Sequence, residues 1–249
     1  MKAFFSQVLD EFLTPDFLEG ARKRYHFAKA QFTELQAVAE KMIPRMHREA
    51  FWERKEYLKQ EPIRSDSCGQ PDKVYECVVM TLGHGIDDLQ ETYDDRGWLL
   101  QSYMTEVLAS EVLLAGYQAY EQYLCTQTDW HVARYHFPGS EKAFPLELLP
   151  DLLREYEPRI TCNHAFYISP NKSVVFLSEL AQGVQTRNGS ICFGCTNRHC
   201  SYRTQSDPAG NEQVTKRQDR PMTYGYSRIY GRETSVLSWQ DLKKGREIK

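Results

Sequence analysis

The chain has 249 residues, of which 41% are hydrophobic, and its formal net charge is −3. This length and apolar content are enough for a buried core, which excludes a linker or a disordered tail. The apolar runs are shorter than the roughly 18 residues that cross a bilayer, and the N-terminus lacks a cleavage site of small residues. We therefore expect a cytoplasmic protein with no membrane contact.

The N-terminal part is predicted to be helical. Residues 16–60 are rich in Ala, Glu, Lys, Arg, Gln and Leu, and Pro44 interrupts them, which predicts two helices with a break. The next residues, 61–73, contain Pro, Gly, Ser and Asp and are interpreted as a loop. We expect these helices to cover one face of the main domain.

The following segments alternate between strand and helix patterns. Residues 73–82 are dense in β-branched and aromatic residues, which predicts a strand, and a helix is expected from His84. Residues 97–125 predict a helix of nearly thirty residues. The remaining predictions are an aromatic-rich loop at 129–145, a short helix at 146–154, and two strands within 160–176 that are joined at 169–172.

The C-terminal segment is basic. Residues 214–249 contain nine Lys or Arg and four Asp or Glu, which leaves −8 for the preceding part of the chain. This segment carries no nucleic-acid-binding signature, so no nucleic-acid partner is expected. The expected organisation is an N-terminal helical segment, a main domain and a basic extension, at residues 1–66, 67–213 and 214–249.

One acidic residue interrupts the long helix. At 100° per residue, Glu111 falls in the middle of an apolar face made of Leu100, Met104, Val107, Leu108 and Ala115. A carboxylate there either reaches the rim of the helix or is buried beside a cation or a ligand amine.

Three of the seven cysteines crowd into the sequence ICFGCTNRHC. Cys192, Cys195 and Cys200 form a Cys-x2-Cys-x4-Cys pattern, whose close first pair lets two thiolates bind one ion. Zinc and iron–sulfur clusters both require four ligands. The fourth is expected from a distant cysteine such as Cys162 or Cys68, from His199, or from an external ligand.

Two other chemistries are open to these cysteines. Cys192 and Cys195 could form a redox pair, because Arg198 and Arg203 would lower the pKa of the thiols. Alternatively, a metal with an open position beside a histidine could support hydrolysis.

The sequence ARYHFPGSEK, residues 133–142, is a second candidate site. Arg134 precedes a Pro138-Gly139 turn by four residues, and such a loop can hold a carboxylate or stack on a base. Three nearby histidines are candidate acid–base groups or ligands, although single histidines among aromatic residues are more often structural: His131, His136 and His164.

The order of these pieces resembles the activation domain of cobalamin-dependent methionine synthase, specifically stand-alone relatives that end in a Cys-x2-Cys-x4-Cys motif. The likeness covers about residues 73–203 and rests on TLGHGIDDL, the long helix, the Arg-x3-Pro-Gly loop, ITCNHAFYISPNKSVV and the cysteines. The chain departs from the family's Arg-x-x-Pro-Gly-Tyr pattern by one extra residue and by Ser140 in place of Tyr.

The resemblance implies an α+β fold, with a long, curved antiparallel sheet and flanking helices. It also implies S-adenosylmethionine binding, in which Arg134, Pro138 and Gly139 would hold the amino-acid part, and Glu111 would supply a carboxylate for an ammonium or for Arg134. The implied function is that of an accessory protein in the reductive reactivation of a corrinoid protein, such as the cobalamin domain of methionine synthase. The cysteine site would then carry the electron.

A different class of function is consistent with the same residues. The curved sheet could have lost S-adenosylmethionine and serve as a non-catalytic binding module with structural zinc, which recognises a protein or a small molecule.

Overall fold

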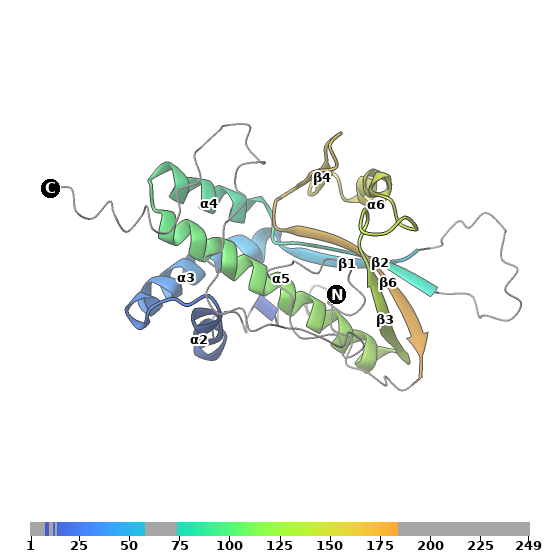
Figure 1. The fold of residues 1–249 in the computed structure, drawn as a ribbon, viewed down its shortest axis with the longest axis horizontal. Coiled ribbons are helices and arrows are strands. Elements are labelled where there is room, and N and C mark those ends of the chain that lie inside the picture. Colours follow the sequence, from blue (N-terminus) through green and yellow to red (C-terminus); the bar gives the residue numbers. More distant parts are fainter. Residues whose placement is uncertain (1–7, 10–11, 13, 58–73, 184–249) are drawn as a thin grey trace, which may run out of the picture. The chain divides into compact units, whose positions relative to one another are not determined.

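The computed structural model describes residues 8–9, 12, 14–57 and 74–183 of the chain. These residues form an antiparallel sheet of four strands in the order β1-β2-β6-β3, flanked by helices, which confirms the expected α+β class (Figure 1).

The strands are β1 (Phe51–Tyr57), β2 (Val74–Thr81), β3 (Trp130–His136) and β6 (Ser173–Gln182). A separate pair consists of β4 (Thr161–Cys162) and β5 (Ile168–Ser169). The helices are α2 (Pro15–Arg24), α3 (Phe32–Glu49), α4 (His84–Asp95), α5 (Leu99–Gln127) and α6 (Leu149–Leu153), with short 3₁₀ turns η1 (Lys29–Gln31), η2 (Leu146–Leu148) and η3 (Arg154–Tyr156).

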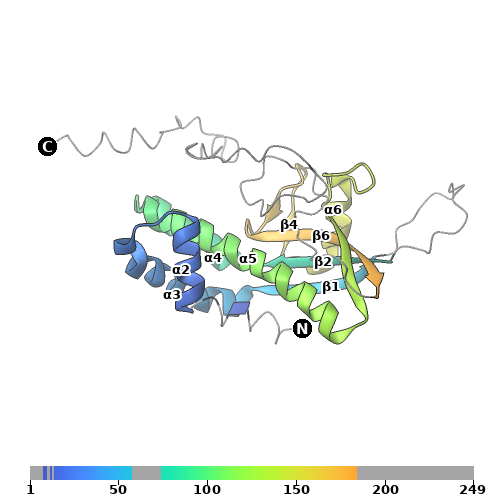
Figure 2. The same cartoon turned by 60° about the horizontal axis from the view of Figure 1, so that its bottom comes forward.

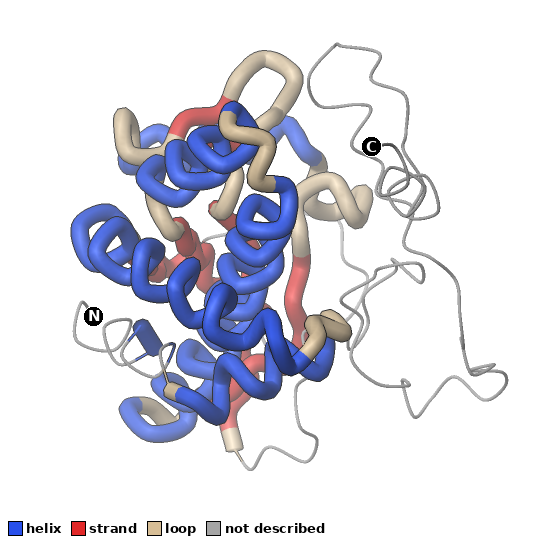
Figure 3. The backbone as a smooth tube through the Cα atoms, turned by 90° about the vertical axis from the view of Figure 1, so that its left-hand side faces the viewer, coloured by secondary structure: helices blue, strands red, loops and turns tan. Residues whose placement is uncertain are grey.

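The two faces of the sheet have different coverings. We call them the α5 face and the α6 face, after the helix that packs on each. On the α5 face, the strand residues Val78 and Phe176 share one core with α2, α3, α4 and α5. On the α6 face, Val79 and Leu177 belong to a second core with α6 and its flanking segments. Figures 2 and 3 show the helices gathered on one side of the strands, and Figure 2 shows α6 on the other side.

Helix α2 begins with an ordinary capping arrangement. The Thr14 side chain accepts a hydrogen bond from the backbone N–H of Phe17, and Pro15 occupies the first turn, where a missing N–H costs nothing. Basic residues in the last turn complement the negative end of the helix dipole: Arg22, Lys23 and Arg24.

The predicted break at Pro44 is wrong, because α3 continues through it to Glu49. A proline inside a helix removes one backbone hydrogen bond and costs roughly 3 kcal/mol. Met42 and Met46 on either side of Pro44 are fully buried in the α5-face core, and this packing outweighs the local preference.

A close approach between α3 and α4 explains the glycines of the sequence TLGHG. Gly83 has φ of +86°, and a Cβ there would lie 2.3 Å from the Cβ of Glu49. The backbone N–H of Gly85 donates to Glu49 Oε2 at 2.8 Å. Glycine at residue 83 is therefore required by both its conformation and the available space.

The predictions for β2, α4 and α5 are confirmed. Helix α5 has 29 residues and is therefore about 44 Å long. Its first half lies beside α3 and α4, and its second half passes the strands (Figure 1). Its buried residues are distributed around much of its circumference, because α2, α3 and α4 pack on it as well as the sheet.

Two expected non-strand segments are strands. Residues 51–57 were expected to continue a helix, but they form β1, which pairs with β2 along its whole length. Residues 130–136 were expected in a loop, but they form β3, which pairs with β6. Strand pairing with partners far away in the sequence outweighs the helix-favouring composition of residues 51–57.

The segment 160–176 differs in part from its prediction. A turn does join two strands at residues 169–172, but these strands are not paired with each other. Strand β5 pairs with β4, whereas β6 lies in the main sheet between β2 and β3.

The expected domain boundaries, near residue 66 and at 213–214, lie outside the described residues. Among the helices of the described part, no span is long and apolar enough to cross a membrane.

Candidate functional site

The predicted cysteine site lies mostly outside the described residues, which include Cys162 but not Cys192, Cys195 or Cys200. The Cys162 thiol donates to the backbone oxygen of Asn163 at 3.7 Å, and partial burial raises its pKa. Within the described ranges, no group of three or more His, Cys, Asp or Glu side chains is arranged to hold a metal. The metal site therefore stays a prediction from spacing.

Arg134 lies on β3 within a polar cluster on the α6 face. Its Nη2 donates to Glu141 Oε1 at 3.3 Å, and the Nδ1 of His136 lies 3.0 Å from the same oxygen. The other ring nitrogen of His136, Nε2, lies 3.3 Å from Glu179 Oε2. We call these four residues the Arg134 cluster.

The sheet register explains why these side chains meet. Arg134 stands directly opposite Glu179 of β6, and directly opposed residues of an antiparallel pair share a face. The register shifts between Val132 and Arg134, and a bulge of this kind re-aims the side chains that follow it.

The His136 ring is buried among aromatic side chains. It packs against Phe144, with a centroid distance of 4.7 Å, and edge-on to Tyr75 at 5.9 Å. Both partners belong to the α6-face core, which places the whole cluster on that face. Of the three candidate histidines, His136 is the one that joins the site, whereas His164 is exposed and the Nδ1 of His131 is buried with no hydrogen-bond partner.

The Pro138-Gly139 turn forms as predicted. The backbone N–H of Ser140 donates to the carbonyl of Phe137 at 2.9 Å, and Gly139 has φ of +83°. Proline and glycine therefore occupy the two central turn positions that favour them. The N–H of Gly139 also donates to the carbonyl of Phe144 at 2.8 Å, which folds the loop back on itself beside Glu141.

Glu111 is buried and paired, as one of the two interpretations of its position expected. Its oxygens accept two hydrogen bonds from Arg24 Nη1, at 2.8 and 2.7 Å, and one from the Tyr25 hydroxyl at 2.8 Å. These contacts tie α5 to the end of α2, on the side of the sheet away from Arg134. The structure does not bring Glu111 and Arg134 together.

A buried polar network on the α5 face was not predicted. Glu76 of β2 accepts hydrogen bonds from Arg54 and from the Tyr120 hydroxyl, the latter at 2.9 Å. The Tyr120 hydroxyl also contacts Ser178, and the guanidinium of Arg54 stacks over the Tyr123 ring, 5.0 Å from its centroid. The sequence signal that could have indicated it is the acidic Glu76 inside the mostly apolar strand β2.

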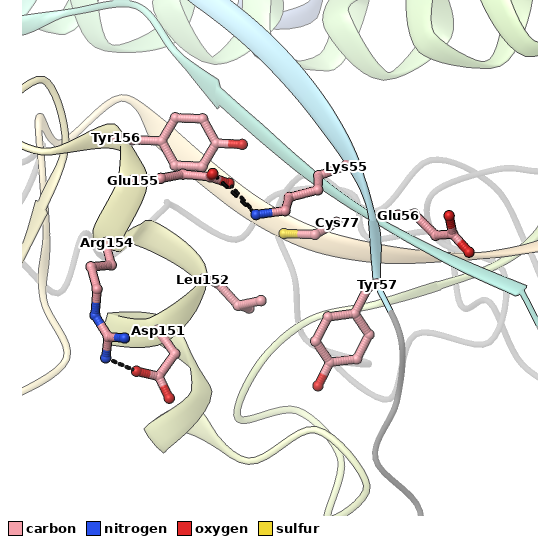
Figure 4. Close-up of a pocket in the computed structure, with 9 residues that line it drawn as sticks. All are labelled: Lys55, Glu56, Tyr57, Cys77, Asp151, Leu152, Arg154, Glu155 and Tyr156. Atoms are coloured by element: carbon pink, nitrogen blue, oxygen red, sulfur yellow. Dashed lines mark hydrogen bonds and ion pairs between the residues drawn. The ribbon is translucent and has the colours of Figure 1, made fainter.

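A pocket of about 340 Å³ opens on the α6 face between β1 and the α6 segment (Figure 4). Figure 4 shows the Cys77 sulfur and the Leu152 side chain facing this space, with the Lys55–Glu155 ion pair across it. Burial is the main reason why the pKa of Cys77 rises to about 12, so the thiol stays protonated at neutral pH. Charged lining residues pair with one another, as Arg154 does with Asp151.

Comparisons with known proteins add no assignment, because no protein-family model and no curated protein matches the chain.

Proposed function

We propose that the protein docks on a corrinoid protein, such as the cobalamin domain of methionine synthase, and supports its reductive reactivation. The cobalt centre of the partner takes up one electron and then the methyl group of S-adenosylmethionine, which leaves methylcobalamin and S-adenosylhomocysteine. We further propose a fold like that of the methionine synthase activation domain, to which the sequence is similar. The described α+β architecture is compatible with this proposal.

The observation that carries the proposal is that Arg134 binds a carboxylate and is accessible from solvent. Its guanidinium already binds a carboxylate, that of Glu141, which follows the Pro138-Gly139 turn by two residues in the chain. The Arg134 side chain is 39% exposed, so a ligand can reach it from solvent. Arginine is suited to hold the carboxylate of an amino-acid ligand, because its planar fork matches the two oxygens.

The electron step is assigned to the predicted site at Cys192, Cys195 and Cys200, with Cys162 or an external group as the fourth ligand. A site of this composition holds iron–sulfur clusters or zinc, and only the former can pass an electron. Protein purified without oxygen should be brown if the site holds an iron–sulfur cluster and colourless if it holds zinc, and metal analysis gives the stoichiometry.

Remethylation provides the test. The full chain is mixed with a corrinoid domain in the cob(II)alamin state, titanium(III) citrate and S-adenosylmethionine, and methylcobalamin is followed by its visible spectrum. The chain should accelerate methylcobalamin formation, and Arg134→Gln should remove the acceleration. If the chain neither binds the corrinoid domain nor changes the rate, the proposal is wrong.

The second candidate is a non-catalytic binding module with structural zinc. The observation that favours it is the placement of Glu111, which is bound by Arg24 and Tyr25 rather than available for a ligand beside Arg134. In this case the purified chain should contain zinc, show no binding of S-adenosylmethionine in calorimetric titration, and lack activity in the remethylation assay.

A further inference from the structure

Arg134 uses few of its hydrogen-bond donors. Nη2 makes one long contact of 3.3 Å with Glu141, and the buried Nε has no hydrogen-bond partner. A guanidinium binds a carboxylate most strongly through two parallel hydrogen bonds. The contact with Glu141 is therefore a weak one that a better-placed carboxylate can replace.

Glu141 is held by more than Arg134. The oxygen that faces Arg134 also lies 3.0 Å from His136 Nδ1, and a β-bridge links the backbone of Glu141 to that of Phe144. His136 is in turn held on its other side by Glu179. Glu141 can therefore stay in place when another carboxylate takes its position on Arg134.

The charges of the cluster select among ligands. Arg134 lies beside Glu141, and Glu179 stands opposite it on β6. A simple carboxylate on Arg134 would add a further negative charge beside these two glutamates. An α-amino acid brings an ammonium as well, which can compensate a glutamate within the same site.

From this geometry we propose that Glu141 determines which ligands Arg134 accepts. Glu141 occupies the guanidinium in the absence of ligand, and it binds the α-ammonium once the ligand's carboxylate has taken Arg134. This assigns to Glu141 the ammonium-binding role that the sequence suggested for Glu111, which lies on the other side of the sheet and is bound by Arg24. The inference rests on the proposed function in one respect, namely that Arg134 is the carboxylate clamp.

Two probes that differ only in the ammonium group test the proposal: L-methionine and 4-(methylthio)butanoate. Each is titrated calorimetrically into the full chain and into Glu141→Gln, whose folding is checked by circular dichroism. Glu147→Gln is the matched control, since Glu147 is an exposed acid in the adjoining η2 turn. Glu141→Ala serves as a second variant in case the first does not fold.

The wild-type chain should bind L-methionine more tightly than 4-(methylthio)butanoate. Glu141→Gln should shift the ratio of the two dissociation constants by about fivefold toward 4-(methylthio)butanoate, the size expected for one partly exposed ion pair. Glu147→Gln should keep the wild-type ratio. An unchanged ratio in the Glu141 variants overturns the inference, and so does a wild-type chain without preference or without binding of either probe.

The remethylation assay keeps the two proposals separate. If the ratio of the two dissociation constants shifts but the chain does not support remethylation, the amino-acid site is supported and the corrinoid role is contradicted. Remethylation that proceeds while the ratio stays unchanged retains the function and removes the role of Glu141.

Discussion

The two faces of the sheet each carry an arginine–glutamate ion pair, and the two pairs differ in burial. On the α5 face, the ion pair of Arg54 and Glu76 lies under a 29-residue helix, and the Glu76 side chain is 11% exposed. On the α6 face, the Arg134 side chain is 39% exposed and its ion pair is long. The Arg54–Glu76 pair therefore belongs to a closed core, whereas Arg134 remains within reach of a ligand.

Adjacent residues of β1 show the same contrast within a single strand. Arg54 points to the α5 face, while Lys55 points to the α6 face and pairs with Glu155, a half-exposed residue of the η3 turn. Removing Arg54 leaves the buried charge of Glu76 without its partner, whereas removing Lys55 leaves the hydrated charge of Glu155. The same substitution should therefore reduce stability more at residue 54 than at residue 55.

The largest effect is expected for Arg54→Met. It leaves Glu76 as an unpaired, mostly buried carboxylate, and we expect a loss of about 3 kcal/mol in the free energy of unfolding, measured with urea and circular dichroism. The double variant Arg54→Met/Glu76→Met should recover most of this loss. Lys55→Met is the control and should cost less than about 1 kcal/mol. Equal losses in the free energy of unfolding for Arg54→Met and Lys55→Met would contradict the proposed difference between the two faces.

A smaller effect on stability is expected at the ion pair of Arg24 and Glu111, which attaches α2 to α5. In a double-mutant cycle of Arg24→Gln and Glu111→Gln, the coupling free energy should be about 1 kcal/mol, because Arg24 is half exposed and partly hydrated. Binding of S-adenosylmethionine should not change in Glu111→Gln. If binding weakens while stability is preserved, Glu111 belongs to the ligand site after all.

Sequence patterns predicted the elements whose determinants are local. The strand β2, the helices α4 and α5, and the Pro138-Gly139 turn depend on β-branched density, apolar periodicity and turn residues within each segment. The Arg134 loop was predicted as a candidate carboxylate site; the structure shows a contact of Arg134 with Glu141, and ligand binding there stays a prediction.

The missed features depend on partners far away in the sequence. Strand β1 carries the helix-favouring residues Glu53, Arg54, Lys55 and Glu56, and only its pairing with β2 makes it a strand. Glu111 is separated from its partner Arg24 by 87 residues, and His136 from Glu179 by 43. The apolar periodicity of α5 predicted that Glu111 needs a partner, but only the fold shows that this partner is Arg24.

The closed α5 face should also show itself in a pH profile. Burial raises the pKa of Glu121, although the Tyr135 hydroxyl, which donates to it at 2.7 Å, partly opposes the shift. The native state then holds this proton more tightly than the unfolded state, so stability falls as pH rises from about 4.3 through the raised pKa. Glu121→Gln should remove this fall and raise the free energy of unfolding at pH 7 by about 0.5 kcal/mol, measured in urea. A wild-type pH slope that persists in the variant contradicts the assignment.

The smallest effect concerns Cys77 on the α6 face, a buried thiol that lines the pocket between β1 and the α6 segment. Cys77 is 4% exposed, and burial raises its pKa to about 12, which leaves almost no thiolate at neutral pH. Cys125, which is exposed on α5, is the internal control. With iodoacetamide at pH 7.5 and peptide mapping by mass spectrometry, Cys125 should be modified well before Cys77, because the thiolate is the reactive form. Raising the pH should accelerate Cys77 modification while the protein stays folded. Early modification of Cys77 at pH 7.5 would mean that the α6 face opens further than the structure shows, and the difference between the two faces would then be larger than the charges alone indicate.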